Sequence, residues 1–125
     1  MKFIKGGTDE TGMVRGRLQM ASKSYAAVSG PWRNGALPNG KYEVRTRHVV
    51  IAGLKASYKA GGAEFFIPIE PEFDTTRKGL GIHPDGGKHT GTLGCIGLVG
   101  RDSLSFWNAW NAMTLANRPD VLYVE

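Results

Sequence analysis

Residues 79–98 read GLGIHPDGGKHTGTLGCIGL, and this order indicates a short strand, a tight turn, a glycine-rich loop and then a cysteine. Gly79–His83 is short and apolar, as β-strands are, and it runs directly into the turn-forming residues 84–87. The glycines that follow allow the backbone to approach a ligand closely around Cys95. The stretch therefore predicts a β-rich fold that carries a functional loop.

Outside this stretch, short strands and turn signals alternate along most of the chain. The strand candidates are Arg17–Met20, Ser24–Val28, Lys41–Thr46, His48–Ile51, Glu64–Ile69 and Val121–Val124. Gly accounts for 18 of the 125 residues, about twice the average usage of roughly 7%. Scattered glycines of this kind favour many tight turns. At 125 residues the chain has the length of one domain, which we expect to cover residues 1–125.

One helix is expected directly after the cysteine. Asp102 or Ser103 can cap its start, and Arg118 with Pro119 ends it. Apolar residues spaced three and four apart form its buried stripe: Leu104, Trp107, Trp110, Met113 and Leu115. We therefore expect a mainly β domain, a sandwich or barrel, with one principal helix.

The net charge of +5 is unevenly distributed. Residues 1–60 hold 11 Lys and Arg against 3 Asp and Glu, whereas residues 61–125 hold 5 against 8. A basic half is either a solvated surface or a binding surface for an anionic polymer, such as nucleic acid or the bacterial envelope. A non-catalytic binding module is accordingly the alternative to an enzyme. Of the three tryptophans, only Trp32 lies in an expected loop where it could be exposed.

The N-terminus has two lysines but no apolar run of signal-peptide length, because polar residues and glycines interrupt residues 6–10. No stretch approaches the roughly 18 apolar residues of a membrane span. The sequence therefore predicts no signal peptide and no membrane insertion.

Cys95 is the only cysteine, so no intramolecular disulfide can form. A lone cysteine is either a small buried apolar residue or a nucleophile. A free thiol, with a pKa of about 8.5, needs a nearby base to react at neutral pH. His83, at the end of a strand, is the better candidate base; His89, inside the loop, is a candidate for contact with substrate. These histidines and His48 lack metal-ligand spacing, so no metal or cofactor is expected.

Two blocks of the chain resemble the catalytic domain of the L,D-transpeptidase family. Residues 81–83 (GIH) and 92–96 (TLGCI) are similar to its active-site signature, a glycine–hydrophobic–histidine strand followed later by Ser/Thr-x-Gly-Cys. Residues 25–30 (YAAVSG) and 34–44 (NGALPNGKYEV) are similar to an upstream motif of the same superfamily. The closest branch contains type VI secretion peptidoglycan effectors and small phage-encoded proteins. Together the blocks span roughly residues 20–100.

The resemblance implies that Cys95 is the nucleophile and that His83 is its base. It further implies that the backbone carbonyl of Pro84 orients the histidine and that the N–H groups of Gly94 and Cys95 form an oxyanion hole. Thr92 takes the Ser/Thr position of the motif, where it supports the loop or contacts substrate.

This chain departs from the family pattern at two positions: Leu93 replaces a second histidine, and Gly97 replaces an arginine. Arg77 or Arg101 could supply the missing charge for a substrate carboxylate. Asp85 and His89 complete the candidate substrate-binding residues.

The expected substrate is therefore bacterial peptidoglycan, with no nucleic-acid partner. Cys95 would attack a stem-peptide bond and form a thioester, with carboxypeptidase or endopeptidase cleavage favoured over exchange. The thiol would then titrate below the pKa of a free thiol. A phage lysin or a secreted effector, made in the bacterial cytoplasm and delivered to the wall by a holin or a secretion system, fits the absence of a signal. The sequence does not indicate an immunity or delivery partner.

Overall fold

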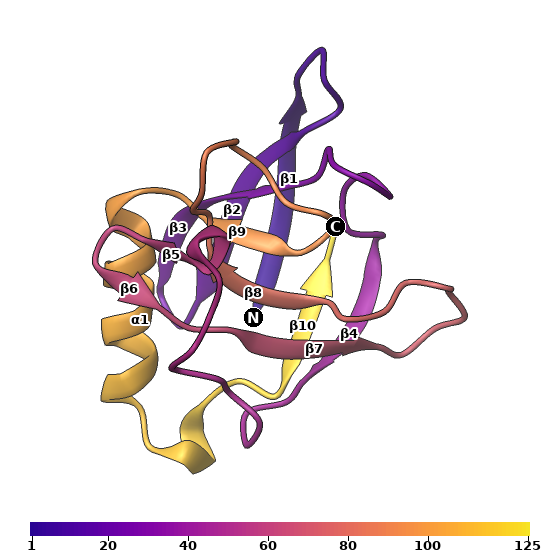
Figure 1. The fold of residues 1–125 in the computed structure, drawn as a ribbon. Helices are drawn as coiled ribbons and strands as arrows, with labels where there is room; N and C mark the ends of the chain where they lie inside the picture. The colour runs from indigo at the N-terminus through magenta and orange to yellow at the C-terminus, as the bar shows by residue number, and fades with distance from the viewer.

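The computed structural model describes all 125 residues, and eight strands close into a barrel in the order β1-β10-β4-β7-β8-β9-β3-β2 (Figure 1). These strands are β1 (Lys2–Thr8), β2 (Val14–Met20), β3 (Lys23–Ser29), β4 (Gly40–Val44), β7 (Ile67–Pro71), β8 (Gly81–Pro84), β9 (Ile96–Leu98) and β10 (Val121–Val124). The pairs β1·β10 and β8·β9 are parallel and the others are antiparallel. The expected mainly β fold with one principal helix is confirmed.

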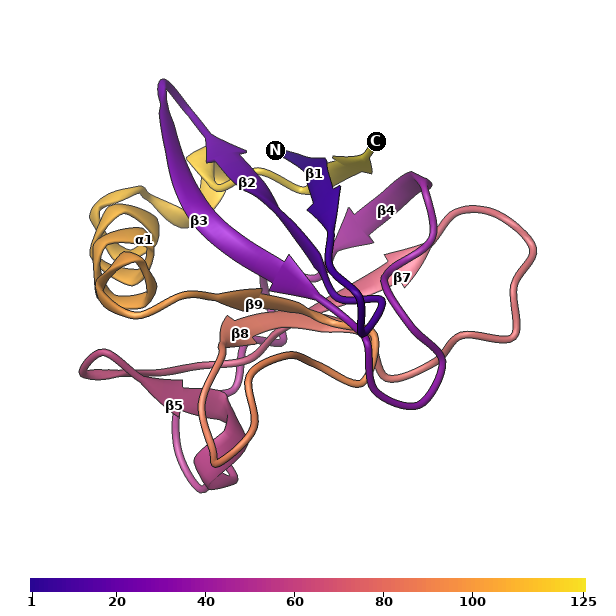
Figure 2. The same cartoon turned by 90° about the horizontal axis from the view of Figure 1, so that it is seen from above.

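The remaining elements lie outside the barrel. They are the 3-10 turns η1 (Ala56–Tyr58) and η2 (Leu115–Asn117), a two-stranded sheet of β5 (Lys59–Ala60) and β6 (Ala63–Glu64), and the helix α1 (Arg101–Ala112). The helix packs along β3 and β9 and against the small sheet (Figure 2). No helix has both the length and the apolar character needed to cross a membrane.

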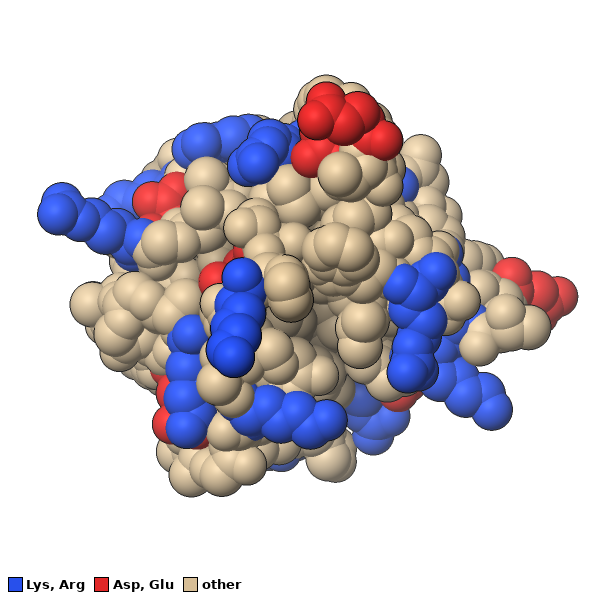
Figure 3. All heavy atoms as spheres, turned by 45° about the horizontal axis from the view of Figure 1, so that its top comes forward, with Lys and Arg blue, Asp and Glu red and all other residues tan.

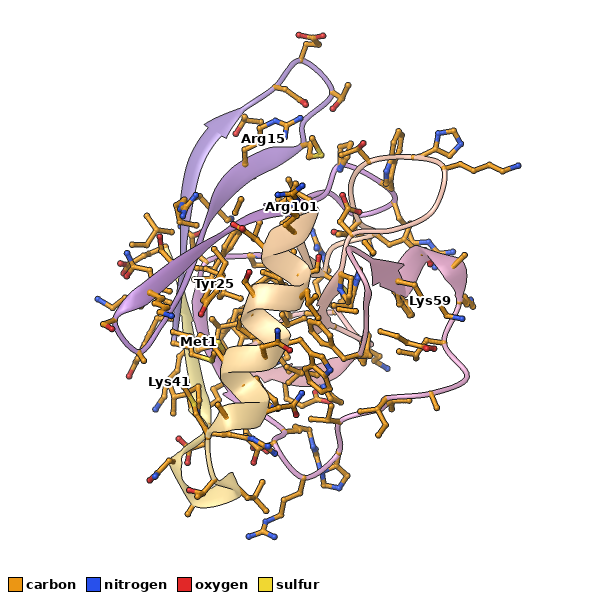
Figure 4. All side chains as sticks on the ribbon, turned by 90° about the vertical axis from the view of Figure 1, so that its left-hand side faces the viewer. Met1, Arg15, Tyr25, Lys41, Lys59 and Arg101 are labelled. Atoms are coloured by element: carbon orange, nitrogen blue, oxygen red, sulfur yellow. The ribbon has the colours of Figure 1, made fainter.

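The core fills the barrel and continues beneath α1. Phe106 and Trp110 of the helix are 0% and 1% exposed. Tyr25, which lies beside the helix in Figure 4, meets the ring of Phe106 edge-on at 5.4 Å between centroids. Phe65 stacks on Trp107 at 4.5 Å with an interplanar angle of 6°. Burying each such ring contributes about 1.5–3 kcal/mol, so α1 is firmly attached to the barrel.

The buried face of α1 differs from the predicted stripe. Its buried residues are Ser103, Phe106 and Trp110, whereas Leu104 is 37% exposed. The helix ends at Ala112, so Leu115 lies in η2 and is 39% exposed. Ser103 can be buried because its hydroxyl donates a hydrogen bond to Leu98 O at 2.9 Å. A pattern of apolar residues does not predict a buried serine of this kind.

The predicted cap of the helix is also wrong. Gly100 is the N-cap, with a φ of 54°, and no side chain caps the helix. The carboxylate of Asp102 instead accepts the Ala26 N–H at 2.6 Å, which ties the start of the helix to β3. Asp102 therefore bonds to the backbone of a distant strand instead of capping its own helix.

Two strand predictions are corrected as well. His48–Ile51 is a loop that meets the rest of the sheet only through the bridge between Val50 and Phe66. The predicted strand Glu64–Ile69 is divided between β6 and β7, because Phe66 pairs with Val50 at that point. Strand β1 was not predicted; β9, with a glycine at its centre, has little strand propensity of its own.

Candidate active site

The parallel pair β8·β9 brings His83 and Cys95 to one face of the barrel. Ile82 is paired with Ile96, and both side chains point into the core. Side chains alternate across a sheet, so the adjacent His83 and Cys95 point outward, and both line the same surface cavity. Because the strands are parallel, residues 85–95 must return from the end of one strand to the start of the other. That return path forms a wall of the site.

His83 is held in one orientation by its own strand. Its Nδ1 lies 2.7 Å from Pro84 O, so Nδ1–H donates to this carbonyl and Nε2 keeps a free lone pair. The hydrogen bond expected between His83 and Pro84 is therefore present. The ring is 3% exposed and packs between Tyr58, at 4.4 Å, and Phe66, at 6.0 Å between centroids. Burial lowers the pKa of His83 to about 4, against a smaller opposing effect of the Pro84 hydrogen bond.

Cys95 is 7% exposed, and its thiol donates to Gly79 O at 3.8 Å. Burial raises the pKa of the thiol to about 11, against a smaller lowering by the Gly81 backbone N–H. The expectation of a thiol pKa below that of free cysteine is therefore wrong, since desolvation outweighs the effect of the Gly81 N–H. At neutral pH Cys95 is therefore a thiol and His83 a neutral imidazole, and both line the same cavity.

Two buried hydroxyls hold the backbone carbonyl of Cys95. Ser29 Oγ donates to it at 2.8 Å and Thr92 Oγ1 donates to it at 2.7 Å. Ser29 Oγ in turn accepts the Leu37 N–H at 2.8 Å. The Cys95 N–H makes no hydrogen bond within the protein. The upstream motif contains Ser29 but does not predict this role, because the contact with Cys95 depends on the pairing of β3 with β9.

The side chain of Thr92 also accepts hydrogen bonds from two backbone N–H groups near Cys95. Its Oγ1 accepts the Gly30 N–H at 3.1 Å and the Gly94 N–H at 3.2 Å. The amide of Gly94, which the resemblance assigns to the oxyanion hole, is thus engaged by a side chain. Of the two amides expected there, only the Cys95 N–H is free.

The cavity beside Cys95 has a volume of about 460 Å³. Its lining residues are Trp32, Lys55, Ser57, Tyr58, His83, Gly86, Gly87, Lys88, His89, Gly91, Thr92, Leu93 and Cys95. His89 is exposed and lies near Trp32, with 6.2 Å between ring centroids. Trp32 is 43% exposed, as the sequence predicts. The volume suits part of a peptide rather than a whole polymer chain.

The segment before β5 forms the wall that faces the glycine-rich loop. Figure 2 shows η1 and the returning loop projecting together from the barrel, and the Gly86 N–H donates to Ser57 O at 3.0 Å. A Cβ at Gly86 would clash with the carbonyl oxygens of Ala56 and Lys59. This close approach places Tyr58 against His83. Burial, and then the charge of Cys95, raise the pKa of the Tyr58 hydroxyl.

Three of the predicted substrate-binding residues lie outside the cavity lining. Asp85 accepts the Gly91 N–H at 3.1 and 3.2 Å with its two oxygens, and burial raises its pKa. Arg77 donates to the carbonyls of residues 34–36 and lies over Gly94. Arg101, at the start of α1 in Figure 4, lines a separate hollow with Gly61 and helix residues. Asp85 and Arg77 therefore support the loops around Cys95.

No group of three or more His, Cys, Asp or Glu side chains is arranged to hold a metal ion. Comparisons with protein-family models, with curated proteins and with solved structures found no match to this chain. The chemistry of the site is accordingly argued from its own geometry.

Proposed function

We propose that this protein is a cysteine acyl-transfer enzyme that acts on peptidoglycan stem peptides, with Cys95 as nucleophile and His83 as base. The observation that carries the proposal is the orientation of His83. Its Nδ1–H is fixed on Pro84 O, and it shares the outer face of β8·β9 and one cavity with Cys95. The choice of peptidoglycan rests on the sequence motifs that resemble the L,D-transpeptidase family.

In the first step the thiol turns from Gly79 O toward Nε2 of His83. Nε2 takes the proton as Sγ attacks the carbonyl carbon of the peptide bond. Both groups are neutral at rest, so the proton moves during the attack and no preformed thiolate is required. The imidazolium then gives the proton to the leaving amine as the C–N bond breaks, and a thioester remains on Cys95.

The oxyanion formed in this step needs hydrogen-bond donors directed at one point. The free N–H of Cys95 is the backbone donor available for it. Ser29 and Thr92 hold the carbonyl of the same residue, so they restrict rotation of the Cys95 backbone around that donor.

Deacylation completes the reaction. Attack by water on the thioester gives carboxypeptidase or endopeptidase cleavage, and attack by an amine gives exchange. The resemblance to the branch of effectors and phage proteins favours hydrolysis.

Digestion of defined muropeptides, with product identification by mass spectrometry, tests the proposal. We expect wild-type protein to shorten or cleave stem peptides, and Cys95→Ala to show no turnover while its circular dichroism spectrum is unchanged. His83→Gln should lose turnover, whereas His48→Ala, a control at an exposed histidine outside the cavity, should keep it. Full activity of Cys95→Ala would overturn the assignment. Binding of peptidoglycan without turnover by any of the proteins would favour the non-catalytic module.

A further inference from the structure

The cavity beside Cys95 is lined by two cationic side chains and by no acidic one. The cations are Lys55, before η1, and Lys88, in the returning loop; both are exposed. Figure 3 shows Lys and Arg side chains on both sides of an uncharged middle area of one face, with most acidic side chains nearer its edge. An anionic group on a ligand would therefore meet attraction and no repulsion from the cavity wall.

The two lysines come from two segments of the cavity wall that contact each other. The hydrogen bond from the Gly86 N–H to Ser57 O joins their two segments, and Gly87 also packs against Ser57. The positions of the lysines thus depend on a single, tightly packed contact.

Both lysines are free to bind a ligand. Neither forms an ion pair within the protein, whereas nearby Lys59 is paired with Glu64 at 3.6 Å. Asp85, in the same loop as Lys88, is occupied by the Gly91 N–H. The charge of the two lysines is therefore uncompensated.

Two other lining residues give the cavity an apolar part. Leu93 is 55% exposed and Trp32 is 43% exposed, although both are large and apolar. The indole of Trp32 is fixed by a hydrogen bond from its Nε1 to Thr90 O at 3.0 Å. A ligand that combines an aliphatic chain with an anionic end matches this combination of surfaces.

We propose that Lys55 and Lys88 bind a free carboxylate of the stem peptide whose bond Cys95 attacks. The inference rests on the proposed function and adds the specificity of the same site. Arg77 and Arg101, the sequence-based candidates for this role, lie elsewhere, so Lys55 and Lys88 are the Lys and Arg side chains that line the cavity.

The expected effect is moderate because the lysines are exposed. Removing one exposed ion pair weakens binding about two- to fivefold at ordinary salt, and removing both should weaken it on the order of tenfold. The effect should shrink as salt rises, since exposed charges are screened.

The test compares a stem tetrapeptide that has free carboxylates with the same peptide in amidated form. Binding to the Cys95→Ala protein is measured by calorimetry, and turnover by the intact enzyme is measured separately. We expect amidation to weaken binding, and we expect Lys55→Gln/Lys88→Gln in the Cys95→Ala background to weaken binding of the free acid to the level of the amide. Lys23→Gln, at the start of β3 and outside the cavity, is the control and should bind as the parent does.

The binding and turnover results separate the two proposals. Equal binding of the acid and the amide, an unchanged affinity in the double lysine variant, or no binding of either peptide would overturn the role of the lysines. Lysine-dependent binding without turnover by the intact enzyme would support that role and would contradict the proposed catalysis.

Discussion

Burial and one backbone contact set the protonation state and the orientation of His83, the proposed base. The hydrogen bond to Pro84 O fixes the tautomer, and the surrounding Tyr58 and Phe66 rings exclude water. Because burial disfavours the imidazolium, the pKa falls from 6.5 to about 4. Free imidazole is thus available as a base over a wider acidic range than in an ordinary histidine.

We therefore expect kcat/KM to be retained at pH 5, where a histidine with an ordinary pKa of about 6.5 would be mostly protonated. The acid limb should have its midpoint near the His83 pKa of about 4. The measurement is a pH–rate profile on one muropeptide, with an NMR titration of the His83 ring assigned by the His83→Gln variant. An acid limb and a ring titration both centred at pH 6.5 would contradict this prediction.

The hydroxyl of Ser29 acts on Cys95, the proposed nucleophile, through the backbone. In Ser29→Ala, Cys95 O keeps only its bond from Thr92, and the buried Leu37 N–H loses its acceptor. We expect the free energy of unfolding to fall by about 1–3 kcal/mol. We expect kcat to fall on the order of tenfold to a hundredfold, because the thiol is displaced from its attack position.

Urea unfolding and steady-state kinetics measure these two effects of Ser29→Ala. Ser24→Ala is the matched control, because Ser24 lies on the same strand but is exposed and bonded only to Arg17. If the loss of kcat were no greater than in the control, Ser29 would have only a structural role.

At the scale of elements, the site depends on the contact between η1 and the returning loop. Gly86 lies too close to the carbonyls of Ala56 and Lys59 for any Cβ, so Gly86→Ala should push η1 away from the barrel. Tyr58 would then leave the face of His83. We expect a loss of stability of about 1–3 kcal/mol and at least a tenfold lower kcat/KM, with the barrel retained.

Gly7→Ala is the control for this prediction, because a Cβ at Gly7 meets no atom within 4 Å and its backbone needs no positive φ. Circular dichroism monitors the barrel, and turnover monitors the site. Equal activity of the two variants would show that the position of η1 does not matter for catalysis.

The same elements show how far the sequence could predict this site. The segment before His83 is short and apolar and leads into a proline turn. These local signals are enough to predict β8 and to place His83 near its end. Cys95 follows the glycine-rich loop directly in the sequence, and this closeness makes it a clear candidate nucleophile.

What the sequence could not show depends on contacts between distant residues. Ser29 reaches Cys95 O across 66 residues through the register of β3 and β9. Lys55 and Tyr58 reach the cavity because η1 docks on Gly86, and no local pattern encodes that docking. The prediction of the buried side of α1 was wrong for a similar reason. Ser103 can be buried because its hydroxyl donates a hydrogen bond to the Leu98 carbonyl of β9.

For the whole molecule, burial of a titratable group links its protonation to folding. His83 has a pKa of about 4 in the folded protein and an ordinary value of 6.5 when exposed in the unfolded chain. Between these values the unfolded chain binds more protons, so the free energy of unfolding rises with pH. The contribution of His83 is complete above pH 6.5 and is lost as the pH falls toward 4.

The loss amounts to about 3 kcal/mol, because one pKa unit corresponds to about 1.36 kcal/mol. Urea unfolding at several pH values between 4 and 7 measures it. In His83→Gln, which keeps a polar side chain but cannot be protonated, the total change in stability between pH 4 and pH 7 should be smaller by this amount. An unchanged pH dependence in His83→Gln would mean that other groups account for all of it and that His83 is not held neutral by the barrel.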